Sequence, residues 1–144
     1  MRKLFLIGLA LAIVSMLVLA GCGPSFSSNG QRIYFTATSN SGERITYYGG
    51  PGMMMRFVCA NCHGPQGHGG RIAIMMQTLD VPNITWPELT AQDMDHPPYT
   101  EEILKRAITQ GLDPAGDPLK YPMPHWQMSD SDLNDLVSFI KTLK

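Results

Sequence analysis

The sequence predicts a small, mainly helical domain, and two capped amphipathic segments are the main evidence. The first covers residues 101–110, where Thr100 is a candidate N-cap, two acids lie in the first turn and Gly111 ends the helix. The second follows Ser129, which opens an S-D-S-D sequence similar to a capping box with Asp in place of the usual Glu. Pro51 begins a third candidate helix, which would carry the Cys59 side chain on its last turn.

Apolar side chains recur at helical spacing in the two capped segments. Ile103, Leu104, Ala107 and Ile108 share a face of the first, and Leu133, Leu136, Val137, Ile140 and Leu143 form a stripe on the second. Prolines at positions 114, 118, 122 and 124 predict extended chain between the two helices. Each stripe needs an apolar partner, so the helices are expected to share one core.

The N-terminus is typical of an export signal over residues 1–21. Two basic residues precede an apolar run that ends in Leu-Ala-Gly-Cys, a sequence that resembles a bacterial lipobox. This resemblance implies cleavage before Cys22 and a lipid on its sulfur. The alternative is an uncleaved membrane anchor, although the apolar run is short for a span. Both interpretations predict an exported protein tethered to a membrane.

The chain after the signal divides into a tether and one domain. Residues 22–31 are small and polar, as in a flexible linker, and residues 32–144 suffice for one core. Within that domain, residues 32–50 contain two β-branched and aromatic runs around a Ser-Asn-Ser-Gly turn, which favours a short hairpin. Without residues 1–21 the formal charge falls from −1 to −3, with 9 basic and 12 acidic side chains, and nothing indicates nucleic-acid binding.

The densest chemical signal is the C-x-x-C-H sequence formed by Cys59, Cys62 and His63. A structural zinc site usually needs a second cysteine pair, and a thioredoxin-like pair needs alternating strands and helices around it; neither is present in the sequence. In covalent haem attachment, one turn of backbone sets both sulfurs under the haem vinyl groups, and the next residue supplies the proximal ligand. The sequence therefore predicts one haem c. A disulfide or reduced pair beside an unrelated histidine is the alternative.

From Pro51 onward the chain resembles the class I c-type cytochromes. The resemblance rests on an ordered set of segments: CANCHGPQGHGG, VPNIT, YTEEILKRAITQGLDPAGDPL, YPMPHW and MSDSDLNDLVSFIKTL. It implies an all-α cytochrome c fold in which the N- and C-terminal helices cross beside one haem. The family's G-x-x-[IL]-[YF] start usually lies just before C-x-x-C-H, whereas GQRIYF is here separated from it by an insertion, which is assigned to residues 32–50.

Three further residue roles follow from the resemblance alone. Met123, between two prolines, corresponds to the second axial ligand. Pro82 corresponds to the residue whose carbonyl accepts the proton of the proximal imidazole, and Phe139 to the aromatic at the helix crossing. Because the chain has ten methionines, Met128 and His125 remain alternatives for the axial position.

Other polar and aromatic residues are weaker candidates. His68 and His96 lie in loops and are expected to face solvent. Trp126 is expected in the core or at the haem rim, where its indole N–H could donate to a propionate, and Arg71 could pair with one.

The function expected from these features is single-electron transfer by one haem c with His63 and Met123 as ligands. The protein would not be an enzyme by itself, and its partners would be redox proteins of a respiratory chain at the exported membrane face. A gas-binding or peroxidase-like haem protein is the alternative, and it requires an accessible distal position with polar groups, for which His125 near Met123 is the only candidate. A third interpretation is a fixed subunit of an oxidase or reductase complex.

Overall fold

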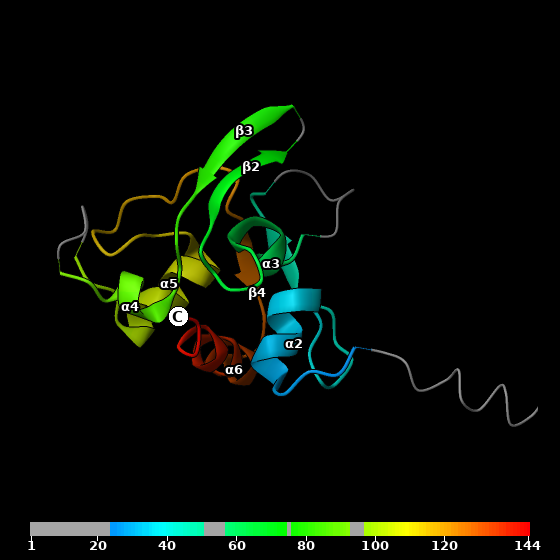
Figure 1. Cartoon of the computed structure of the whole chain (residues 1–144). Coiled ribbons are helices and arrows are strands. Elements are labelled where there is room, and N and C mark those ends of the chain that lie inside the picture. The colour runs from blue at the N-terminus through cyan, green and yellow to red at the C-terminus, as the bar shows by residue number, and fades with distance from the viewer. Residues whose placement is uncertain (1–23, 51–56, 75, 93–96) are drawn as a thin grey trace, which may run out of the picture.

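A computed structural model describes residues 24–50, 57–74, 76–92 and 97–144 (Figure 1). Five helices and four strands are assigned within these ranges. In chain order they are α2 (Asn29–Thr36), β1 (Thr46–Tyr48), α3 (Cys59–His63), β2 (Gly70–Ile74), β3 (Gln77–Val81), α4 (Trp86–Leu89), α5 (Glu101–Gln110), β4 (His125–Gln127) and α6 (Asp130–Ile140).

The two capped helices are confirmed with the predicted bounds at their N-termini. The Thr100 hydroxyl accepts the N–H of Ile103 at 3.2 Å, and Gly111 ends α5 with φ +67°, the left-handed region that glycine tolerates. The Ser129 hydroxyl accepts the N–H of Asp132 at 3.2 Å and begins α6. All five apolar residues of the second stripe are buried in one core, to which α5 contributes Leu104, Ala107 and Ile108.

The N-terminal helix is not where the sequence predicted it. Cys59 is the first residue of α3 rather than part of the last turn of a longer helix, and residues 51–56 lie outside the described ranges. The helix that packs against α6 is α2, which contains the GQRIYF segment and takes in the last three residues of the expected 22–31 tether. Ser28 caps it by accepting the N–H of Gln31. The part of the insertion that follows α2, residues 37–50, therefore lies between α2 and the C-x-x-C-H segment.

Helices α2 and α6 cross at very close range, as Figure 1 shows at the lower part of the molecule. A Cβ added at Gly30 would lie only 1.9 Å from the Asp135 carbonyl oxygen, so this contact needs a glycine. The Tyr34 and Phe139 rings meet at the crossing with centroids 5.3 Å apart. The structure thus places Phe139 at the crossing of the N- and C-terminal helices.

The hairpin expected in residues 32–50 does not form as predicted. Its first run is helical in α2, and the turn is closed by an isolated bridge between Thr38 and Arg44 and by neighbouring backbone hydrogen bonds, without a pair of regular strands. Its second run forms β1, which pairs antiparallel with β4 far along the chain, with Tyr47 opposite Trp126. The reason is aromatic packing, because the Tyr47 and Trp126 rings lie 5.2 Å apart and Trp126 is buried.

A second antiparallel pair, β2 with β3, follows the C-x-x-C-H segment, and the sequence did not predict it. It projects beyond the helices at the top of Figure 1. Ile72, Ile74 and Leu79 alternate along one half-buried face, while the opposite face is exposed. The fold is therefore mostly helical but not purely all-α. Among the described helices, none combines the length and apolar character needed to cross a bilayer.

Candidate haem site

The C-x-x-C-H residues make up the whole of helix α3. This single turn places Cys59 and Cys62 three residues apart on a helix that ends at His63 and has Gly64 as its C-cap, where φ is +76°. No disulfide joins the two cysteines. Burial raises the pKa of the Cys59 thiol to about 12 and also raises that of Cys62.

These raised pKa values bear on the alternative uses of the cysteine pair. A redox-active pair relies on a thiol whose pKa is lowered so that a thiolate is available at neutral pH. Here burial has the opposite effect on both thiols. Within the described residues there is also no group of three or more His, Cys, Asp and Glu side chains that could hold a metal ion. The site therefore lacks the features of a thioredoxin-like or zinc site in the described part of the chain.

His63 is buried and held in one orientation by a backbone carbonyl. It is 6 % exposed, and its Nδ1 lies 3.2 Å from the Pro82 carbonyl oxygen. Burial lowers the pKa of His63, and the hydrogen bond to Pro82 partly opposes that effect. With Nδ1 donating to the carbonyl, the neutral ring keeps Nε2 unprotonated, which is the form that binds a metal. The structure thus brings together His63 and Pro82, two of the residues the sequence indicated.

A glycine turn and the β2–β3 pair bring the Pro82 carbonyl back to His63. The Gly69 N–H donates to the His63 carbonyl at 2.9 Å. A Cβ added at Gly69 would lie 2.4 Å from the Pro82 carbonyl oxygen, and its φ is +63°. Only glycine tolerates both the positive φ and the close approach of the Pro82 carbonyl. The sequence analysis did not single out Gly69, although the GHGG segment was the signal available.

Tyr34 is a supporting residue that the sequence analysis also missed. Its side chain is fully buried, and its hydroxyl donates to the Gly64 carbonyl at 2.6 Å. Burial raises the pKa of Tyr34, so the phenol keeps its proton and remains a donor. Because Gly64 directly follows His63, this bond ties the end of α3 to the helix crossing. The tyrosine of the GQRIYF segment was the signal for it.

Met123 lies half-buried in the segment that precedes β4. It packs against the same core cluster as Cys59 and Cys62, and so does Met128. Pro124 next to Met123 is buried, and the Met123 N–H donates to the Lys120 carbonyl at 3.2 Å, which closes a turn just before it.

The remaining histidine and arginine candidates are engaged elsewhere or exposed. The His125 ring lies 4.9 Å from the Tyr48 ring, and a Cβ added at Gly111 would lie 2.1 Å from its Nε2. His68 is exposed, and His96 lies outside the described residues. Arg71 pairs with Asp80 at 3.1 Å on the exposed face of the β2–β3 pair. An exposed pair of this kind contributes little to stability.

Trp126 offers a direct test of whether this site suits a haem. Its side chain is 4 % exposed, and its indole Nε1 is buried with no hydrogen-bond partner among the described residues. A buried donor without an acceptor costs on the order of 1–3 kcal/mol, so such groups usually serve a ligand or an ordered water. A propionate oxygen is a suitable acceptor. Together with the two half-buried cysteines and the oriented imidazole, this donor fits a haem group.

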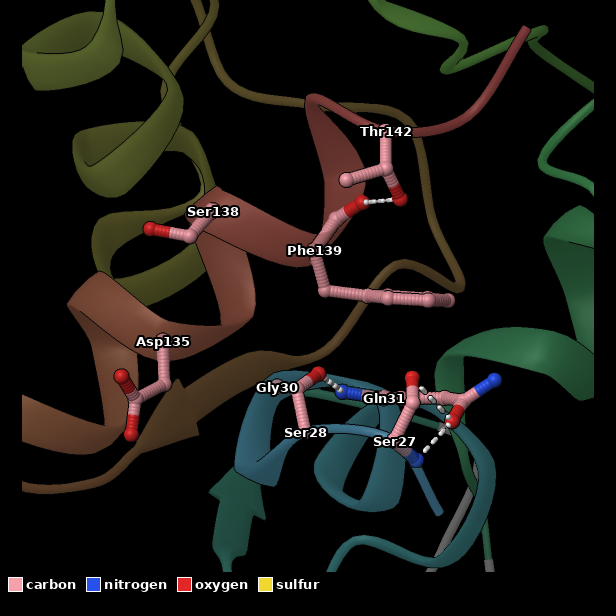
Figure 2. Close-up of a pocket in the computed structure, with 8 residues that line it drawn as sticks. All are labelled: Ser27, Ser28, Gly30, Gln31, Asp135, Ser138, Phe139 and Thr142. Carbon is pink, nitrogen blue, oxygen red and sulfur yellow. Dashed lines mark hydrogen bonds between the residues drawn. The ribbon is translucent and has the colours of Figure 1, made fainter.

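The described residues also form a pocket of about 490 Å³ on a different part of the molecule (Figure 2). It lies beside the α2–α6 crossing and is lined by Ser27, Ser28, Gly30, Gln31, Asp135, Ser138, Phe139 and Thr142. None of the predicted cysteine, histidine or methionine site residues lines it, so it is separate from the candidate haem site.

Comparison with known proteins agrees with this geometry. The family model for cytochrome c matches residues 27–144. A search of curated proteins and a search of solved structures returned no match. The matched range includes the α2–α6 crossing, α3 and the His63–Pro82 contact. The chain therefore belongs to the cytochrome c family, whose members bind haem c covalently and transfer electrons.

Proposed function

We propose that the protein is a single-electron carrier that uses one covalent haem c with His63 and Met123 as axial ligands. The observation that carries this proposal is the buried His63 imidazole, whose Nδ1 lies 3.2 Å from the Pro82 carbonyl. It follows directly after two half-buried, unpaired cysteines on the same helical turn. The oriented ring and the adjacent thiols are the groups that attachment and proximal ligation require.

Each residue of the site has a distinct task in this proposal. Cys59 and Cys62 would form thioethers with the haem, and His63 would offer Nε2 to the iron. The Pro82 carbonyl and the Tyr34 hydroxyl hold α3 in place, while the Trp126 indole would donate to a propionate. When bound, the haem supplies an iron that alternates between the ferrous and ferric states. The protein residues keep it in a dry, stiff environment, so that little structure changes as the electron arrives or leaves.

Met123 is the proposed second ligand. A thioether is a soft, neutral ligand that favours ferrous iron. Its loop is stiff because prolines flank it, Pro124 is buried, and β4 begins two residues later. These features support a methionine held at a constant position.

The packing of His125 supports a carrier over a gas-binding or peroxidase-like protein. Peroxide chemistry needs a polar group aimed at the distal position, and His125 was the candidate for that role. Its ring instead packs against Tyr48 and sits close to Gly111. We therefore propose that the protein has no enzymatic activity of its own. Whether it moves freely between partners or serves as a fixed subunit, the same electron-transfer chemistry applies.

The proposed location is the exported face of a bacterial membrane, where respiratory redox proteins would be the partners. Support comes from the sequence of residues 1–22, which lie outside the described ranges. Mass spectrometry of the native N-terminal peptide should show a mature chain that begins at acylated Cys22. Recovery of an intact signal sequence from extracted membranes would favour the uncleaved anchor instead.

Replacement of Met123 tests the proposed ligation. Ferric wild-type protein should show the weak far-red sulfur-to-iron charge-transfer band, and ferrous protein should bind carbon monoxide poorly. Met123→Ala should abolish the band, open the iron to added ligands and lower the reduction potential, because the soft sulfur is lost. Met128→Ala and His125→Ala are the matched controls and should keep the band. Rapid carbon monoxide binding by wild-type protein, or an unchanged Met123→Ala spectrum, would show that the ligand assignment is wrong.

A further inference from the structure

We infer that the insertion braces the methionine loop, so that residues 46–50 determine how firmly Met123 is held at the iron. This inference rests on the proposed His63 and Met123 ligation. It assigns Thr46 to Gly50 as positioning residues, because none of them is proposed to touch the haem.

The first support is a continuous set of contacts between the insertion and the chain just after Met123. Each of the four residues that follow Met123 meets a residue of the insertion. The pairs are Pro124 with Gly50, His125 with Tyr48, Trp126 with Tyr47, and Gln127 with Thr46. The last three pairs are also partners in the β1–β4 register. A loop held over four successive residues has few ways to move away alone.

The distances show that these contacts are close. A Cβ added at Gly50 would lie 2.9 Å from Pro124 Cβ, so the backbone of Gly50 lies directly against that proline. The Tyr48 and His125 rings have centroids 4.9 Å apart. At the far end, the Thr46 hydroxyl donates to the Gln127 side-chain oxygen at 3.3 Å.

Tyr47 connects the methionine loop to the other segment that holds the haem. Its ring packs edge-on against Phe57, with centroids 6.2 Å apart, and against Trp126 at 5.2 Å. Phe57 lies two residues before Cys59, and Trp126 lies three residues after Met123. One insertion side chain therefore touches the flanks of both the attachment motif and the axial methionine.

The insertion is itself fixed to the helix crossing, as a brace must be. Ile45 is buried, and its N–H donates to the Ala37 carbonyl at the end of α2. The Asn40 N–H donates to the Asn29 side chain at 2.7 Å, and the Asn29 amide donates to Asp132 of α6 at 2.9 Å.

The opposite side of the methionine loop is held by the end of α5. The Leu119 N–H donates to the Gly111 carbonyl at 2.7 Å, and the His125 ring lies against Gly111. Met123 thus lies on a segment fixed before and after it. The insertion holds the loop through its contacts after Met123. Without these contacts, the loop would be held mainly at Gly111.

The consequence is an equilibrium between a state with Met123 bound and a minor state with Met123 released. An external ligand binds only the released state, so its apparent affinity rises in proportion to the population of that state. Weaker contacts between the insertion and the loop should raise that population. Affinity for an added ligand therefore reports on the brace without reference to electron-transfer activity.

The test compares Gly50→Ala and Tyr48→Ala with Gly42→Ala in haem-loaded full-length protein. Gly50→Ala pushes against Pro124, and Tyr48→Ala removes the contact with His125 from a side chain that is 51 % exposed, which should leave the fold intact. Gly42 is a matched control in the same insertion, because a Cβ there meets no atom within 4 Å. Its φ of +84° means that the control still strains the insertion turn.

The measurement is binding of imidazole to the ferric protein, with the far-red band recorded alongside. We expect Gly50→Ala to bind imidazole about tenfold more tightly than wild type and Tyr48→Ala a few-fold more tightly, while Gly42→Ala stays within about twofold. If Met123→Ala abolishes the band but both test variants bind imidazole like wild type, the brace is refuted and the ligation stands. Equal gains in Gly42→Ala and Gly50→Ala would also refute it, because general destabilisation would explain both. If Met123→Ala leaves the band unchanged, the proposed ligation fails first.

Discussion

Replacing Gly30 by alanine should destabilise the protein, although alanine is the better helix former. Gly30 lies in the first turn of α2, where α2 crosses α6. On helix propensity alone, the change should stabilise the fold by up to about 1 kcal/mol. At the crossing, however, the added Cβ would lie 1.9 Å from the Asp135 carbonyl oxygen and 2.9 Å from Phe139 Cβ. Helix propensity and packing therefore predict changes of opposite sign in the free energy of unfolding.

The magnitude follows from how far the helices must separate. Ordinary contact begins at 3.4 Å, so the Asp135 carbonyl would have to retreat by about 1.5 Å. The Asp135 carbonyl belongs to the helix backbone and Phe139 Cβ is bonded directly to it, so neither atom can rotate away. A gap of even ~1 Å loses up to about half of the dispersion energy across an interface, and overpacking typically costs about 1–3 kcal/mol. We expect Gly30→Ala to lower the free energy of unfolding by an amount near the upper end of that range.

Thermal unfolding of the haem-loaded protein, followed by far-ultraviolet circular dichroism, measures this loss. A net cost of about 3 kcal/mol in a domain of this size corresponds to a Tm lower by roughly 10 °C. Gly42→Ala is the control, since its added Cβ meets no atom within 4 Å and only its backbone strain remains. An unchanged or higher Tm for Gly30→Ala would refute the close crossing of α2 and α6.

Three further changes test the site and its supports. Replacing Cys59 and Cys62 by serine should prevent stable haem attachment; wild-type haem should resist acid-acetone extraction, and extractable haem would contradict covalent attachment. Tyr34→Phe should cost about 1–2 kcal/mol in chemical unfolding, because it leaves the buried end of α3 without the 2.6 Å donor to the Gly64 carbonyl; an unchanged midpoint would show that this bond is unimportant. Backbone and N-cap hydrogen bonds lower the pKa of the Glu102 carboxyl, so its stabilising contribution is present above the unfolded pKa of about 4.5 and is lost as the pH falls through the folded pKa. Glu102→Gln should therefore make Tm less dependent on pH below about 5, and parallel curves for the two proteins would argue against it.

The sequence alone determined the features whose interactions are local. Helices α5 and α6 begin at Thr100 and Ser129 because each cap binds an N–H three residues away. The apolar stripe of α6 is also set locally, since helical spacing alone puts its members on one face, and that face is buried. The C-x-x-C-H sequence is equally local, because Cys59, Cys62 and His63 all lie within one helical turn.

Only the tertiary structure decided the placement of α2 and the pairing of β1. The β-branched and aromatic residues of the GQRIYF segment favour a strand locally, yet Gly30 and Tyr34 gain more by crossing α6 as a helix. Strand β1 finds its partner at β4, with Thr46 opposite Gln127, 81 residues away along the chain. Propensity cannot predict such a contact, because its energy comes from aromatic packing with Trp126 that exists only once both segments are in place.

His63 depends on both the local sequence and the tertiary structure. Sequence position alone makes this histidine the residue next to both cysteines, but its orientation depends on a carbonyl 19 residues later in the chain. The β2–β3 pair and the close approach of Gly69 bring that carbonyl within 3.2 Å of Nδ1. Tyr34 reaches the other end of α3 from across the insertion. The identity of the proposed proximal ligand is therefore encoded in adjacent residues, whereas its orientation arises from backbone contacts that the whole fold assembles.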